Sequence, residues 1–339
     1  MSLLINRGQL PLSARFLLLF LFLMLLSALS IIFALSSGSV DISLAQVVKI
    51  ILGDDTGMQA RVIMELRLPR VISGFMVGGM LAIAGALMQV LLKNPLAEPY
   101  VLGVSGGASV CALLAMMAGI AGFWLNMAAF AGALFSIFLV FGLAQFGGSW
   151  NPLRVLLTGI VVASGWGALI SFILAVSPVT QIHGMLFWLM GDLEYAHNFK
   201  FGLAVLVCGF ALSMIIARGL NLMARGDMQA AALGVSVQHL RYVVYFLASM
   251  LTATAVMQAG NIGFIGLIVP HLVRLLLGSD HRILLPVSLL LGGSLLVVAD
   301  TLARGIIAPQ QLPVGVLTAM IGVPLFLFLL QTTMIKSRP

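Results

Sequence analysis

The residues from Val71 to Leu92 form a stretch of chain that contains no charged side chain. A helix needs about 20 apolar residues to cross the hydrocarbon core of a bilayer, so this stretch is long enough for one crossing. Similar runs recur along the chain, in which 61% of the 339 residues are hydrophobic and only 8% are charged. A soluble domain has about a quarter of its residues charged. The sequence therefore predicts an all-α integral membrane protein, because long apolar runs are typical of spanning helices whereas barrels show short alternating strands.

The apolar runs predict about ten spans, since each crossing takes roughly 20 residues. The third and eighth are short or interrupted. No stretch between the spans is long enough for a soluble domain, so residues 1–339 are expected to form a single transmembrane domain. The expected spans lie near residues 16–35, 71–92, 99–118, 123–146, 153–175, 200–217, 242–259, 264–277, 284–302 and 313–335.

The distribution of lysine and arginine predicts the orientation, because cytoplasmic loops are enriched in these residues. With the N-terminus in the cytoplasm and ten alternating spans, all but six of the 17 Lys and Arg residues lie inside. Both termini are therefore expected to be cytoplasmic. The formal net charge of +7 then follows from membrane topology and does not call for a nucleic-acid partner. The six outside residues are Lys49, Arg61, Arg67, Arg70, Lys200 and Arg304.

The sequence NPLAEP, which follows the span at 71–92, interrupts the apolar chain. Pro95 and Pro99 lack backbone donors and push the residues before them out of helical geometry. Irregular backbone at membrane depth persists only where it is buried in protein or lines a wet cavity. The segment is therefore either part of a pathway or a plain cytoplasmic loop, and the small residues of the following GVSGGA (103–108) permit a close approach to a pathway or a neighbouring helix.

Two further features flank this break. Small residues recur every fourth position within the span, at Gly74, Gly78, Ala82 and Ala86, and predict close packing against another helix. At the outer end, Arg67 and Arg70 run against the usual charge bias. They either reach the lipid headgroups or offer a docking surface to an acidic partner, because arginine forms bidentate pairs with carboxylates.

Three blocks of sequence resemble the permease subunits of the ABC importer family for ferric siderophores, haem and cobalamin, the FecCD-type permeases. The first block contains RLPR, GALMQ, NPLAEP and LGVSGGA between Arg67 and Ala108. The second is NIGFIGLIVPHLVRLLLGSDHRILLP, and the third is ADTLARGIIAPQQLPVGVLTAMIGVPLF. The blocks stand in the family's order, and the resemblance extends over nearly the whole chain.

The resemblance implies a type II ABC importer permease fold with ten transmembrane helices, in a multi-pass protein of the bacterial inner membrane. It also implies a homodimer with the substrate path along its interface, two cytoplasmic ATP-binding subunits and a periplasmic substrate-binding protein. The chain itself would be a translocation subunit without catalytic residues, metal ligands or a cofactor. In agreement with this expectation, the chain contains no Walker loop of the form G-x-x-x-x-G-K-[ST].

Site residues follow from the same resemblance. Docking of the binding protein is expected at Arg67, Arg70 and Arg304. The translocation path and its cytoplasmic constriction are expected at Asn94, Pro95, Leu96, Gly103 and Ser105. A second constriction would lie around residues 149–151, although no clean motif is present there. The polar segment 218–241 is expected to couple to the ATPase through Asp227, Ala230, Ala231, Leu233 and Gly234, the alternative being an ordinary loop.

Two other function classes are open at this point. A secondary active transporter driven by an ion gradient would need charged or broken-helix sites near mid-membrane, and Asp300 is the acid that comes closest. An intramembrane enzyme would need a paired catalytic constellation within the spans, and none is visible. The cargo is not encoded in these motifs, and an iron chelate is preferred only because it is the commonest cargo of the family.

Overall fold

The computed structural model describes residues 12–38, 42–53, 57–145, 151–195, 199–307 and 310–336. All regular secondary structure in these ranges is helical, which confirms the all-α class. A π-helical turn occurs at Val62–Arg67, and 3-10 turns occur at Pro99–Leu102 and Leu193–Tyr195. The α-helices are α1 (Leu12–Ser36), α2 (Leu44–Ile51), α3 (Met58–Arg61), α4 (Leu68–Leu91), α5 (Val104–Met117), α6 (Phe123–Gln145), α7 (Pro152–Val176), α8 (Val179–Met190), α9 (Phe199–Arg225), α10 (Asp227–Ala232), α11 (Val237–Ala259), α12 (Ile265–Leu277), α13 (His281–Gly305) and α14 (Val314–Lys336).

Each predicted span falls on one helix, but these helices differ in length. Within the described ranges, 6 helices are long and apolar enough to cross a membrane: Met58–Leu91, which continues through the π-helical turn into α4, and α6, α7, α9, α11 and α13. Shorter apolar helices lie within α1, α5, α12 and α14. A multi-pass membrane protein is supported, whereas the number of ten crossings stays a prediction.

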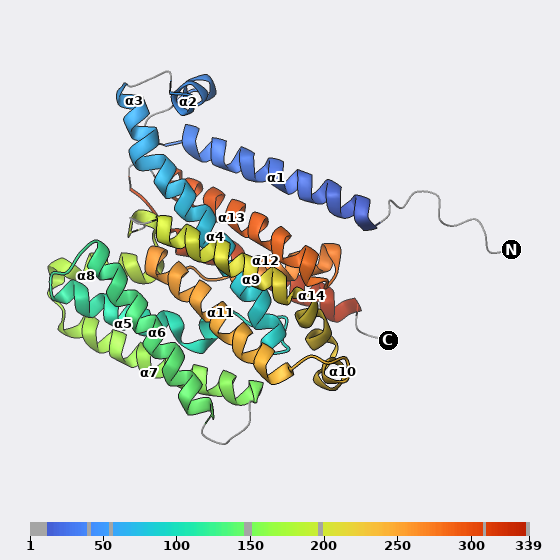
Figure 1. Cartoon of the computed structure of the whole chain (residues 1–339). Helices are drawn as coiled ribbons and strands as arrows, with labels where there is room; N and C mark the ends of the chain where they lie inside the picture. The colour runs from blue at the N-terminus through green and yellow to red at the C-terminus, as the bar shows by residue number, and fades with distance from the viewer. Residues whose placement is uncertain are drawn as a thin grey trace.

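Helix α4 lies at the centre of the bundle, beside α11 and α13 (Figure 1). The predicted stripe of small residues explains how α13 approaches it. A Cβ at Gly78 would overlap the backbone carbonyl of Gly292, and a Cβ at Gly292 would lie 2.6 Å from that of Ala82. The two helices are therefore in backbone contact, and the packing role of the stripe is confirmed.

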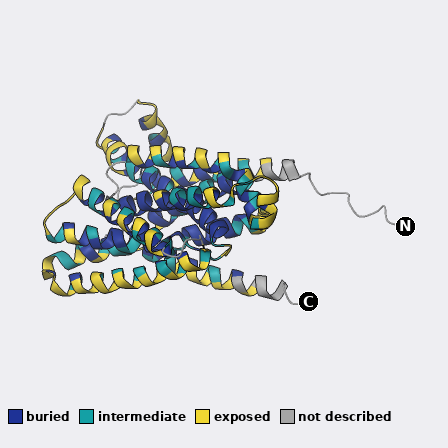
Figure 2. Ribbon diagram, turned by 60° about the horizontal axis from the view of Figure 1, so that its bottom comes forward, coloured by how far each residue is buried: buried dark blue, intermediate teal, exposed yellow. Residues whose placement is uncertain are grey.

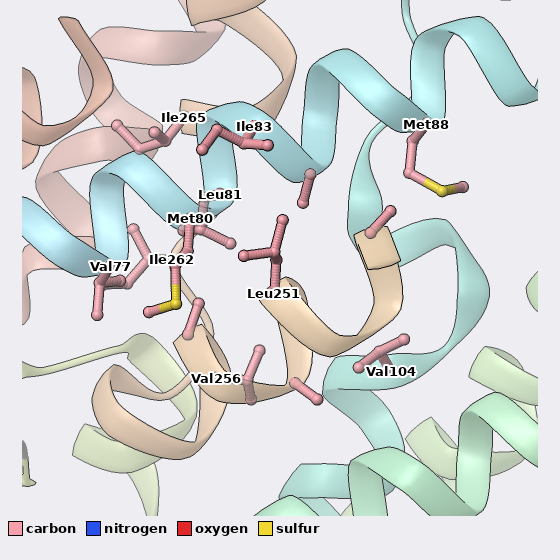
Figure 3. Close-up of a cluster of buried hydrophobic side chains, with 14 of the residues drawn as sticks. Val77, Met80, Leu81, Ile83, Met88, Val104, Leu251, Val256, Ile262 and Ile265 are labelled. Carbon is pink, nitrogen blue, oxygen red and sulfur yellow. The ribbon is translucent and has the colours of Figure 1, made fainter. Parts of the chain in front are cut away.

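The core around α4 is built from large apolar side chains of several helices (Figure 3). Val77, Met80 and Leu81 of α4 are at most 1% exposed, and they belong to the same cluster as Leu251 and Val256 of α11. Since these side chains are fully enclosed by protein, they are shielded from lipid even though the chain is apolar throughout. Helix α4 is thus the central helix of the bundle, and α9, α11, α12 and α13 pack against it.

Helices α5 and α12 are much shorter than a full crossing. They have 14 and 13 residues, which at 1.5 Å per residue is about 20 Å, against a hydrocarbon thickness of about 30 Å. Helix α12 starts beside the middle of α4, because the backbone of Gly266 lies against Leu81 and Gly85. The prediction that the third and eighth spans are short or interrupted is confirmed, and both helices begin within the bundle.

The bundle has two distinct ends. Helix α1 begins, α14 ends and α10 lies at one end, which we call the α10 end, whereas α2, α3 and α8 lie at the opposite α8 end (Figure 1). The outer helices are mostly exposed along their length (Figure 2). In α7 only Val155, Gly159 and Ile173 are buried. A surface this apolar must be covered by lipid or by another protein chain.

Candidate functional site

The turn between α4 and α5 has the irregular backbone that NPLAEP predicts. The side-chain Oδ1 of Asn94 accepts a hydrogen bond from the Leu96 N–H at 2.9 Å, and the Asn94 carbonyl accepts one from the Ala97 N–H at 3.1 Å. Pro95 occupies the second position of this turn, where its fixed φ is favourable. Asn94 and Pro95 are exposed and Leu96 is half-buried, so the residues assigned to the inner constriction are accessible at the surface of the subunit.

The end of this turn is bonded to the second sequence block. The Glu98 Oε1 accepts a hydrogen bond from the backbone N–H of Phe264 at 2.9 Å. The Tyr100 hydroxyl donates to the carbonyl of Ile262 at 3.1 Å and accepts from its N–H at 3.2 Å. Phe264 is the N-cap residue of α12, where a carboxylate is favoured by the positive end of the helix dipole. The first block thus holds the start of α12 in place.

The third block meets the second at the α8 end. The Gly315 N–H donates to the Gly191 carbonyl at 3.2 Å. A Cβ at Gly315 would overlap the carbonyl of Met190 and would lie 2.9 Å from that of Asn261. Gly315 of the third block thus contacts the backbone of Asn261 in the second block and of Met190 and Gly191 at the end of α8, which lies outside both blocks.

The GVSGGA segment packs tightly against α6 and α7. Gly103 has φ +71, a left-handed conformation that favours glycine, and its carbonyl accepts a hydrogen bond from Ser136 Oγ at 2.8 Å. Trp166 Nε1 in turn donates to Ser136 Oγ at 2.9 Å. The expected close approach to a neighbouring helix is confirmed. Ser105 is half-buried, and a path-lining role for Gly103 and Ser105 stays a prediction.

Arg70 and Arg304 belong to a buried ion cluster, which we define as Arg70, Asp192, Asp300 and Arg304. Arg70 Nη2 lies 2.9 Å from Asp300 Oδ1 and 3.1 Å from Asp192 Oδ1. Arg304 Nε lies 3.1 Å from Asp300 Oδ2. The side chains of the two aspartates are only 2% and 4% exposed. The cluster is electrically balanced and joins α4, α13 and the segment that follows α8.

Arg67 is directed into the protein. Its Nη1 donates to the Leu35 carbonyl at 2.7 Å and to the Ser36 carbonyl at 3.1 Å, and the residue is 5% exposed. These bonds satisfy carbonyls at the last turn of α1, which have no partner within that helix. All three arginines thus have internal partners that the sequence did not indicate. Docking of a binding protein through these arginines stays a prediction. A binding protein would have to compete with the internal partners of the three side chains.

Helix α10 forms a compact element in the predicted coupling segment. It starts at Asp227, whose Oδ2 is bonded to Lys93 Nζ at 2.5 Å and to Arg241 Nη2 at 2.6 Å. Gly234 ends it with φ +83, and the Gly234 N–H donates to the Ala231 carbonyl at 3.0 Å. Ala230 is fully buried. Of the residues assigned to ATPase contact, Ala230 therefore packs against its own chain instead of facing outward.

The outward face of α10 and the residue after it is mostly apolar, although Gln229 is also exposed. Met228 and Leu233 are 88% and 67% exposed, and Ala231 is exposed beside them. Met228 was missed at the sequence level, although it lies within the DMQAAALGV segment that was singled out. The sequence carries a weak signal for it, because Met228 is a large apolar residue among small ones in a polar segment. Coupling to an ATPase stays a prediction that this surface supports.

The Asp227 cluster predicts a pH dependence of stability. Burial by itself would raise the pKa of Asp227, but the hydrogen bond from Lys93 and the charge of Arg241 outweigh this effect and lower the pKa below its ordinary value. A group whose pKa is lower in the folded state stabilises the fold above its ordinary pKa, and this contribution is lost as the pH falls through the lowered value.

We therefore expect acidification from neutral pH to reduce the Tm of the purified protein more than that of the Asp227→Asn variant. Thermal unfolding in detergent at a series of pH values measures the difference. Glu65→Gln is the matched control, since Glu65 is exposed near the α8 end. If Tm depends on pH in the same way in the wild type and in Asp227→Asn, the Asp227 cluster does not cause the pH dependence of stability.

The second constriction expected at residues 149–151 falls largely on residues 146–150, which lie outside the described residues. Asn151 is described, and its side chain accepts a hydrogen bond from the Leu153 N–H at 2.9 Å as the N-cap of α7. Within the described part of the chain, no group of three or more His, Cys, Asp or Glu side chains is placed to hold a metal ion.

Comparisons with known proteins agree with this arrangement. The family model of the FecCD transport family matches residues 23–332. The chain is 43% identical over 275 residues to the cobalamin import system permease protein BtuC of Halobacterium salinarum, covering 80% of this chain and 74% of that protein. It is 42% identical over 274 residues to the Fe(3+) dicitrate transport system permease protein FecD of Escherichia coli, covering 79% of this chain and 85% of that protein.

The fold is also similar to that of a solved structure. That structure is described as an inward-facing conformation of a metal-chelate type ABC transporter. It superposes on this chain with a TM-score of 0.83 at 30% identity, covering 92% of this chain and 98% of that chain. The fold, the three sequence blocks and the family match point to the same conclusion. The chain belongs to the FecCD transport family and is a membrane permease of the ABC-transporter class.

Proposed function

We propose that the chain is the membrane-spanning subunit of an ATP-driven importer that moves a chelate of the iron-siderophore, haem or cobalamin type from the periplasm to the cytoplasm. Two copies would form a homodimer in the bacterial inner membrane, with the path between them. Two ATPase subunits would bind at the α10 end and a periplasmic substrate-binding protein at the α8 end. The relatives named for cobalamin and ferric dicitrate support this class of cargo, and we prefer an iron chelate.

The observation that carries the proposal is the surface of α10. This helix has six residues, too few for a span, and it lies outside the long apolar helices. Its exposed Met228 and the adjoining exposed Leu233 therefore lie outside the spanning segments, and apolar side chains of this kind are typical at the centre of protein interfaces. The Lys93 and Arg241 contacts to Asp227 fix the helix to the rest of the chain, so a force applied to α10 reaches the bundle.

Ala231→Glu is expected to prevent association of the ATPase subunit. A charge at the centre of an interface must lose its hydration without gaining a partner, so we expect a cost of about 2–4 kcal/mol, or at least about thirtyfold weaker association. Co-purification and the affinity of the ATPase subunit for the permease in nanodiscs measure the effect. Thr180→Glu is the control, because it adds the same charge at an exposed position at the start of α8, at the other end of the bundle. Equal affinity of Ala231→Glu and the control would remove α10 as the docking site.

The energy source is tested in proteoliposomes that contain the permease with its ATPase subunits and binding protein. ATP on the side of the membrane that holds the ATPase subunits should drive uptake of a ferric siderophore, and an ion gradient without ATP should not. Uptake driven by the gradient alone would favour a secondary active transporter. Membership of an ABC-transporter family speaks against that alternative.

A further inference from the structure

Two unusual backbone conformations bracket the NPLAEP turn. Among the described residues, Lys93 and Phe264 are the non-glycine residues with positive φ, at +51 and +70. A left-handed conformation is unfavourable for both residue types, so surrounding contacts must hold it. Lys93 begins the turn, and the Phe264 N–H donates a hydrogen bond to Glu98 near its end. Both of these residues adjoin one short connection, because Lys93 begins it and Phe264 is hydrogen-bonded to Glu98 near its end.

The first end is attached to α10. The Lys93 N–H donates to the Val90 carbonyl at 3.2 Å and the Asn94 N–H to the Gln89 carbonyl at 3.1 Å, which closes the last turn of α4. The Lys93 side chain then reaches Asp227, the first residue of α10. Gly226, with φ +133, precedes Asp227 and separates α10 from α9. The ion pair therefore connects the exposed α10 directly to the turn.

The second end is attached to α12 and α14. Glu98 holds the N–H of Phe264, and the Phe264 carbonyl accepts the first helical bond of α12 from the Ile268 N–H at 2.9 Å. A Cβ at Gly322 would lie 2.7 Å from Cβ of Phe264, so the backbone of α14 rests directly on this residue. The position of Phe264 thus determines where α12 starts and where α14 lies.

The connection between these ends is stiff. Pro95 and Pro99 have fixed φ, and the Asn94 side chain closes its own turn on Leu96. A stiff segment transmits a displacement that a flexible loop would absorb. We propose that residues 93–99 act as a strut between α10 and the start of α12, with Lys93 and Glu98 as the positioning residues at its two ends. This proposal rests on the proposed function, in which the ATPase moves α10 and the turn narrows the path.

The test measures hydrogen–deuterium exchange of backbone amides in the full-length permease in nanodiscs. Glu98→Ala removes the acceptor of the Phe264 N–H, and exchange of residues 264–268 should accelerate at least about tenfold. A strut also requires faster exchange at the far end, in residues 227–232. Reciprocally, Lys93→Ala should accelerate exchange in residues 227–232 and in residues 264–268. Glu98→Gln, which keeps an oxygen acceptor, should show a smaller effect at both ends.

Glu65→Gln is the control and should leave both segments unchanged. If Glu98→Ala does not fold, Glu98→Gln and Lys93→Ala supply the same reciprocal comparison. Faster exchange confined to the mutated end would contradict the proposed strut. An equal increase in exchange in the Glu65→Gln control would also contradict it. The exchange experiment does not require transport. If the wild-type complex hydrolyses ATP but moves no chelate, the proposed function fails. The exchange experiment would still show whether a change at one end of the strut alters exchange at the other end.

Discussion

Arg70→Ala is expected to destabilise the folded permease by about 3–5 kcal/mol, the range typical of removing one member of a buried ion pair. The side chain of Asp192 is 2% exposed, and its remaining hydrogen bond is the one from the Glu194 N–H at 2.9 Å. Without Arg70 this buried carboxylate would lose its salt-bridge partner. The measurement is thermal unfolding of the purified protein in detergent, together with the yield of folded protein after size-exclusion chromatography.

The size of this loss should depend on pH. Burial raises the pKa of Asp192, and the charge of Arg70 opposes that rise. With Arg70 removed, the carboxyl group should bind a proton more readily, so the deficit of Arg70→Ala should shrink as the pH is lowered. Asp192→Asn in the Arg70→Ala background should restore part of the stability at neutral pH, because a neutral amide costs less to bury than an unpaired carboxylate.

Two variants calibrate the effect. Arg61→Ala removes an exposed arginine near the same end of the bundle and should change stability by less than about 1 kcal/mol. Arg70→Lys keeps the charge but loses the fork that binds both oxygens of Asp300, and an intermediate loss is expected. A Tm for Arg70→Ala within error of that for Arg61→Ala would show that the ion cluster does not stabilise the fold.

This result also bears on docking of the binding protein. The resemblance predicts docking at Arg67 and Arg70, but both side chains have internal partners. Charge reversal of these arginines should therefore lower stability before it affects any partner. Weakened docking counts as evidence for an interface only in a variant whose Tm is unchanged. Arg304, which pairs with Asp300 whereas Arg70 pairs with both aspartates, is the best of the three for such a test.

Gly85→Ala is expected to destabilise the protein although alanine is the better helix former by about 1 kcal/mol. A Cβ at Gly85 would overlap the carbonyl oxygen of Gly266 and would lie 2.7 Å from its Cα. Both partners are backbone, so neither can move away by changing a rotamer. The helices α4 and α12 would have to separate, and overpacking of this kind costs about 1–3 kcal/mol or more. Gly85→Leu should abolish the yield of folded protein.

Gly142→Ala is the matched control within α6. No atom lies within 4 Å of a Cβ at this position, and the residue is exposed. The substitution should therefore leave Tm unchanged or raise it, so the two glycine variants should differ in sign. If Gly85→Ala is as stable as the wild type in thermal unfolding, α12 does not approach α4 as closely as the structure shows.

The close contact at Gly85 has a mechanistic consequence. It holds α12 beside the middle of α4, where Glu98 can reach the N–H of Phe264. Helix α5 begins nearby at Val104, with Gly103 as its N-cap, so α5 and α12 both have N-termini that lie within the bundle and not at its surface. Broken helices of this type are typical of transporter pathways, because their free backbone groups need protein or water as partners. Here protein groups meet that need, because Glu98 accepts from the Phe264 N–H and the Tyr100 carbonyl accepts from the Gly103 N–H at 2.9 Å.

The sequence by itself determined the properties that depend on composition and on neighbouring residues. Charge depletion determined the membrane class, and long apolar runs determined the helices. The turn at Asn94 and Pro95 is local, since the asparagine side chain bonds the residue two positions later. The stripe at Gly78 and Ala82 follows from helical periodicity, which places both residues on one face. The family resemblance was also visible in the three blocks, because each block is continuous in sequence.

The tertiary structure alone decided which distant groups meet. Arg70 and Asp300 are 230 positions apart, and Glu98 and Phe264 are 166 positions apart. An arginine at a helix end can pair with lipid, with a partner protein or with its own chain, and all three choices leave the same local sequence. Burial decides among them, because removing a charge from water is favourable only where an opposite charge is already held in place. For the same reason Ala230 and Ala231 look equivalent in sequence, whereas only the packed bundle determines that one is buried and the other exposed.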